Sequence, residues 1–143
     1  MTRQYLPTLA ELIDRLAIVQ LKSIFISENK NAYKKEIEFI MHDIDEILYQ
    51  TEGGIINAEI LRASMIIMLT NRYIWENESK ARAGGSEQDK LLKLTHSING
   101  IRSIAKNIIS SEMGERVDLK IDCLAAELVK EFGDWNIYEN GVS

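Results

Sequence analysis

Apolar side chains recur every three or four positions along most of the chain, the spacing at which they share one face of an α-helix. The pattern is interrupted by stretches of small or polar residues at 27–31, 51–54 and 84–86. The sequence therefore predicts four long helices between about residues 8 and 113, which pair as two helical hairpins. In the fourth helix the apolar positions predict a narrow core seam of Leu91, Leu94, Ile98, Ile101, Ala105 and Ile108.

Residues at the predicted helix starts support these boundaries. Thr8 is followed three positions later by Glu11, which is the pattern of a capping box at the start of the first helix. Ser86 and Asp89 have the same spacing before the fourth helix. Asn57 precedes the third helix, where an asparagine side chain can accept a hydrogen bond from a free backbone N–H.

A shorter fifth helix is expected at about 121–132, followed by a tail at 133–143 that we expect to fray. No linker composition divides the 143 residues, which is an ordinary length for one domain. We therefore predict an all-α fold with a single domain over 1–143. It is a four-helix bundle of two long helical hairpins plus a short C-terminal helix.

Short similarities between the two halves suggest an internal duplication. Residues 25–29 (Phe-Ile-Ser-Glu-Asn) resemble 73–77 (Tyr-Ile-Trp-Glu-Asn), and 42–47 resemble 96–101. If the repeat is real, the two hairpins would pack with pseudo-twofold symmetry.

Composition and charge narrow the function classes. The formal net charge of −5 argues against a general nucleic-acid binder and against adsorption on an anionic membrane surface. A single cysteine forms no internal disulfide, which favours a reducing compartment. The longest apolar stretch, around 65–69, is too short to span a bilayer. We expect a cytoplasmic protein without membrane insertion.

Two polar residues interrupt the apolar stripe of the third helix. Asn71 and Glu78 stand at positions where helical spacing predicts core residues. A buried carboxylate is costly unless it is paired, so Glu78 requires a partner, with Arg82 one turn along and Arg102 on the fourth helix as candidates. The set is either a structural ion pair or a polar pocket between helices.

The two histidines, His42 and His96, occupy matching positions of the proposed repeat. A metal site would require their two helices to face each other, with carboxylates completing the ligands. The Glu-x-x-His spacing of di-iron bundles is absent, so surface or capping roles are favoured. We predict no metal site and no cofactor.

The acidic residues of the second helix allow comparison with a known enzyme type, the helical magnesium-dependent nucleotide pyrophosphohydrolases. The paired Glu-x-x-Glu and Glu-x-x-Asp spacings of those enzymes are not reproduced. A solvated acidic face is the preferred interpretation. The residues concerned are Glu36, Glu38, Asp43, Asp45 and Glu46.

Three stretches, 12–22, 74–82 and 98–108, resemble in this order an uncharacterised family of small bacterial helical proteins. Some members of that family are encoded near lipopolysaccharide and glycosyltransferase genes. The similarity extends over about 9–122, and the sequence departs from the family pattern at Gln20 and Gly100. The features that the resemblance implies fall on Asp14, Lys22, Trp75, Glu78, Arg82, Asn99 and Arg102.

Combining periodicity with this resemblance gives a candidate ligand site between the third and fourth helices. Its predicted members are Asn71, Glu78, Arg82, Asn99 and Arg102. Whether the chain is an enzyme stays open. The favoured function is a non-enzymatic helical interaction or accessory protein, linked to cell-surface polysaccharide synthesis or encoded by a phage. The alternative is a binder of a small molecule or anion, or an enzyme, that uses the candidate site.

The third helix carries more apolar surface than one core stripe needs. Met65, Ile66, Met68 and Leu69 surround the core position Ile67. We therefore expect a homodimer, with a further protein partner as a second expectation. The same residues would serve equally well inside a monomer, beneath the fifth helix.

Overall fold

The computed structural model describes residues 1–51, 56–85 and 87–117. This part of the chain contains helices and no strand, which confirms the all-α prediction. The predicted fifth helix at 121–132 and the tail at 133–143 lie outside the described residues. The helices are α1 (Leu9–Phe25), α2 (Lys30–Gln50), α3 (Ala58–Arg82) and α4 (Gln88–Met113).

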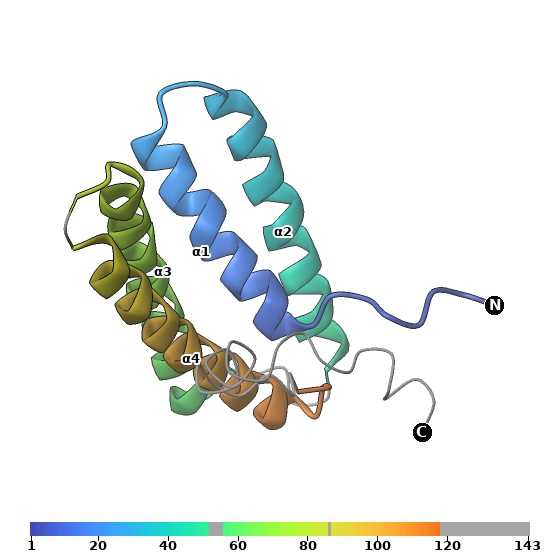
Figure 1. Ribbon diagram of the computed structural model, residues 1–143. Coiled ribbons are helices and arrows are strands. Elements are labelled where there is room, and N and C mark those ends of the chain that lie inside the picture. Colours follow the sequence, from blue (N-terminus) through green and yellow to red (C-terminus); the bar gives the residue numbers. More distant parts are fainter. Residues whose placement is uncertain (52–55, 86, 118–143) are drawn as a thin grey trace.

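The four helices form a bundle of two hairpins, α1 with α2 and α3 with α4 (Figure 1). Helix α1 lies between its partner α2 and the second hairpin, and its backbone closely approaches α3 and α4 as well. Among the described helices, α2 closely approaches only α1. Pseudo-twofold packing of an internal repeat would bring α2 close to α3, just as α1 is close to α4. The described helices do not show this arrangement.

Two of the predicted helix caps are confirmed. The Thr8 hydroxyl oxygen accepts a hydrogen bond from the backbone N–H of Glu11 at 3.2 Å, and the hydroxyl donates to the Glu11 carboxylate at 3.2 Å. At the start of α3, the side-chain oxygen of Asn57 accepts from the backbone N–H of Ile60 at 2.9 Å. These bonds satisfy donors that the first helical turn leaves free.

The start of α4 differs by one position from the predicted capping box. The N-cap residue is Glu87, one position later than expected, and its side chain makes no cap hydrogen bond. Ser86 lies outside the described residues. At the other end, α4 closes on Gly114, whose left-handed backbone (φ 67°) suits a residue without a Cβ atom.

The core is formed by α1, α3 and α4. Ile67 of α3 and Ile109 of α4 are completely buried, and burying an aliphatic side chain of this size contributes about 1.5–3 kcal/mol. Ile44, Ile47 and Leu48 of α2 pack against this cluster from the side. The buried cluster consists of Leu9, Ala10, Ala17, Ile60, Ala63, Ile67, Ala105 and Ile109.

The buried face of α4 differs from the predicted seam. Leu94 and Ile101 are 39% and 50% exposed, whereas Thr95, Ala105 and Ile109 are buried. Thr95, Arg102 and Ile109 are seven residues apart and therefore share one side of the helix, with Lys106 beside them. The inward side of α4 thus carries two cations, a pattern that hydrophobic spacing alone does not reveal.

None of the helices in the described ranges is long and apolar enough to cross a membrane.

Candidate functional site

A buried carboxylate, that of Asp14, lies at the junction of α1, α3 and α4. Asp14 is 7% exposed when the whole residue is counted. It shares the inward stripe of α1 with Ala10, Ala17 and Leu21, which are all buried. A carboxylate in such a position is stable only where hydrogen bonds and opposite charges replace its water.

Side chains from two other helices supply these partners. The Asn71 amide of α3 donates a hydrogen bond to Asp14 Oδ1 at 2.8 Å, and its oxygen accepts from Arg102 Nη1 at 3.1 Å. Arg102 Nε lies 3.6 Å from Asp14 Oδ1, and Lys106 Nζ lies 3.8 Å from Asp14 Oδ2. We call Asp14, Asn71, Arg102 and Lys106 the Asp14 network.

The Asp14 network joins one negative charge to two positive charges, so it keeps an excess positive charge. Its charged side chains are mostly shielded from water, with exposures of 11% for Asp14, 25% for Arg102 and 18% for Lys106. Arg102 Nε is buried and has no hydrogen-bond partner in the described part of the chain. Arg102 therefore retains unused hydrogen-bonding capacity.

A groove of about 400 Å³ lies directly beside the network. Its apolar floor is formed by Ile18, Leu21 and Ile74, and its remaining lining is aromatic, polar or charged. The polar and aromatic lining residues are Lys22, Asn71, Trp75, Glu78, Ser79, Arg82 and Arg102.

The charges of this groove do not cancel. Glu78 pairs with Arg82 at 3.7 Å, but these side chains are 46% and 80% exposed, and such surface pairs are weak. Lys22 has no hydrogen bond or ion pair from its side chain to any described residue. With Lys22, Arg82 and Arg102 against a single carboxylate, the groove is locally positive on a chain whose net charge is −5.

Four of the five predicted site residues meet at this groove: Asn71, Glu78, Arg82 and Arg102. Asn99 lies half-buried on α4 and does not line it. Glu78 is half-exposed rather than buried, because the chain turns Asn77, which is 5% exposed, inward at that level. Its partner is Arg82, one of the two candidates that the sequence offered.

Periodicity alone missed the residue at the centre of the network. Asp14 entered the sequence argument only through the family resemblance, as did Lys22 and Trp75. The sequence does contain a usable signal for Asp14. It stands in a helical stripe with Ala10, Ala17 and Leu21, just as Asn71 stands in the apolar stripe of the third helix.

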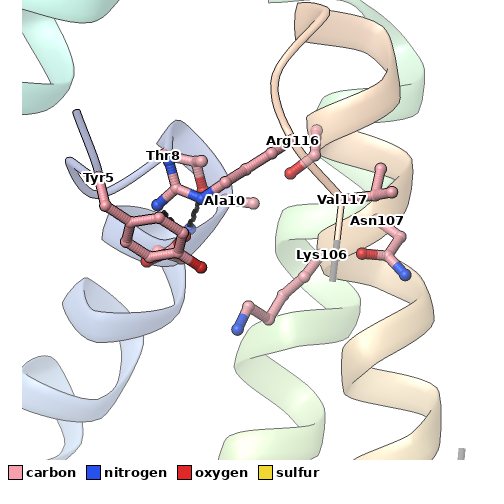
Figure 2. Close-up of a pocket in the computed structure, with 9 residues that line it drawn as sticks. Tyr5, Thr8, Ala10, Lys106, Asn107, Arg116 and Val117 are labelled. Carbon is pink, nitrogen blue, oxygen red and sulfur yellow. Dashed lines mark hydrogen bonds and ion pairs between the residues drawn. The ribbon is translucent and has the colours of Figure 1, made fainter. Parts of the chain in front are cut away.

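A second cavity, of about 580 Å³, lies on the other side of the network near the N-terminal segment (Figure 2). Figure 2 shows the Arg116 guanidinium over the ring of Tyr5, 3.7 Å from its centroid, and Lys106 reaching from α4 toward α1. Arg116 also pairs with Glu11 at 2.9 Å, and Lys106 faces Asp14. Both cations of this cavity have partners, whereas Lys22 of the groove has none among the described residues, so the groove is the stronger candidate for an anion.

The histidines do not come together. His42 is exposed on α2, where a hydrogen bond between its Nδ1 and Asp43, at 3.1 Å, raises the pKa of the imidazole. His96 is exposed on α4, a helix that α2 does not closely approach. On the acidic face, Glu36 pairs with Arg15 across α1 and α2. Within the described ranges, no group of three or more His, Cys, Asp or Glu residues could hold a metal ion.

Comparisons of this chain with protein-family models, with curated proteins and with solved structures find no match. We therefore infer the function of the chain from the geometry of the groove and of the Asp14 network.

Replacing Asp14 by Asn should lower the free energy of unfolding by about 2–4 kcal/mol, because it leaves two shielded cations without their counter-charge. Urea unfolding followed by circular dichroism measures this change. The matched control is Glu36→Gln, which removes a solvent-exposed ion pair and should cost less than about 0.5 kcal/mol. Equal small losses in both variants would show that the network contributes little to the fold.

Proposed function

We propose that the groove between α1, α3 and α4 binds a small anionic molecule. The observation that carries this proposal is that Lys22, which has no side-chain partner among the described residues, faces the same groove as Arg102 and Arg82, and that Glu78 is the one carboxylate among the described lining residues. We therefore place ligand binding, the alternative in the sequence analysis, ahead of the favoured role as an interaction or accessory protein.

Arg102 supports the proposal through its fixed position. Asn71 and Asp14 anchor part of its guanidinium, so the side chain loses little further conformational freedom when a ligand arrives. A planar guanidinium also matches the geometry of phosphate and carboxylate oxygens. Asp14 therefore acts as a positioning residue for the cation that would contact the anion.

The apolar floor has a separate consequence. Leu21 and Ile74 are buried at 4% and 7% exposure, so a molecule in the groove rests partly against a surface of low polarity. Charge interactions strengthen where water is excluded. The same floor favours a ligand that carries an apolar or ring-shaped part beside its anionic group.

Pyrophosphate is the simplest probe of the anionic part. Isothermal titration calorimetry at low salt should detect its binding, and the Lys22→Gln variant should bind it about tenfold or more weakly, since a charge-assisted contact is lost. Raising the salt concentration should weaken binding further. The control is Lys34→Gln, an exposed lysine of α2 away from the groove, which should leave the affinity unchanged.

Two outcomes would contradict the anion site. One is the absence of binding to pyrophosphate by the folded protein at low salt. The other is an equal loss of affinity in Lys22→Gln and Lys34→Gln, which would indicate non-specific attraction to surface charge.

We also propose that the chain forms a homodimer through an exposed face of α3. Leu61, Met65 and Leu69 are 51%, 65% and 69% exposed, and their spacing of four residues aligns them along the helix. Ile66 and Met68, which the sequence placed on the same apolar surface, instead pack against the core. Antiparallel pairing of α3 with the same helix of a second copy would cover this line on both subunits at once.

Light scattering coupled to size-exclusion chromatography tests the dimer. The unmodified chain should elute with twice the mass of one subunit, and Met65→Glu should shift it to a monomer, because a charge would be buried in the interface. Arg62→Glu, on an adjacent exposed position of α3, is the control for charge alone. A monomeric mass for the unmodified chain at tens of micromolar would overturn the dimer.

A further inference from the structure

Trp75 lines both the groove and a third, shallower cavity. This cavity has a volume of about 460 Å³, and Trp75 and Ser79 line both spaces. Each volume falls within the range of about 300–1,000 Å³ that is usual for small-molecule pockets. One extended ligand could therefore place one part in the groove and another across Trp75. The shallower cavity is lined by Phe25, Arg72, Trp75, Glu76, Ser79 and Lys80.

The shallower cavity offers flat surfaces. The Arg72 guanidinium lies over the Phe25 ring, 4.3 Å from its centroid, and Glu76 fixes it with a hydrogen bond of 2.8 Å. Aromatic rings and guanidinium planes are the groups on which nucleobases stack in proteins. Trp75 thus lines both the groove with its excess cations and the cavity with these flat surfaces.

We propose that the ligand is a phosphorylated nucleoside whose phosphate occupies the groove near Lys22 and Arg102 and whose base stacks on Trp75. This assignment rests on the proposed anion site. The base extends toward the Phe25–Arg72 pair, and the partly exposed carboxylate of Glu78 accepts hydrogen bonds from ribose hydroxyls.

Each feature excludes a simpler ligand. An inorganic anion would use the cations and leave Trp75 and the shallower cavity empty. A sugar phosphate would use the cations and Glu78, but it has no flat ring to stack on Trp75 or beside the Phe25–Arg72 pair. A phosphorylated nucleoside uses all three.

The test compares AMP with ribose 5-phosphate, which carry the same phosphate and differ in the base. Calorimetry on the full chain should show AMP binding on the order of tenfold tighter, since stacking of a base on an aromatic side chain has roughly this effect. Trp75→Leu should remove the difference, so that AMP and ribose 5-phosphate bind with similar affinity. Trp75→Phe should keep most of the difference, and Tyr73→Leu, an exposed aromatic residue outside both cavities, should keep all of it.

Equal affinities for AMP and ribose 5-phosphate, with pyrophosphate still bound, would overturn the nucleoside and leave the anion site standing. The same conclusion follows if AMP binds more tightly but the advantage survives Trp75→Leu in protein that circular dichroism shows to be folded. Failure of all three probes to bind would overturn the anion site and the nucleoside together.

Discussion

Within the described part of the chain, the carboxylate of Asp14 is the group that opposes the two cations on the inward side of α4. The inward side of α4 carries Arg102 and Lys106, and both ammonium and guanidinium groups lose water when the helix packs against α1 and α3. Without an opposing charge that desolvation would be unfavourable. Asp14 supplies the charge from α1, and Asn71 of α3 completes the hydrogen bonds, so one network links three helices.

The same constraint connects the packing to the proposed function. Because one carboxylate faces two cations, the network keeps a positive charge, and Arg102 carries it to the wall of the groove. Asn71 and Asp14 hold the inner side of Arg102. A charged group that is already held in place is suited to recognise an anion with little loss of entropy. In the proposed site, stability and anion recognition would therefore depend on the same few atoms.

The sequence was sufficient for the helices and less so for the groove. Helical spacing and cap residues such as Thr8 and Asn57 are local signals, and both caps formed as predicted. The buried side of α4 was misassigned because Leu94 and Ile101 are as apolar as true core residues, and only the arrangement of neighbouring helices decides which are covered. Asp14 could be placed on an inward stripe, but its partners are 57 to 92 residues away and no local pattern names them.

A double-mutant cycle between Asp14 and Arg102 tests the central claim most directly. The free energies of unfolding of the unmodified chain, Asp14→Asn, Arg102→Gln and the double variant isolate the energy that couples the two side chains. If the buried network organises the three helices, the double variant should lose less free energy of unfolding than the two single variants lose together. The difference should exceed about 1 kcal/mol. Losses that add to within about 0.5 kcal/mol would show that the two residues act independently, which contradicts the account.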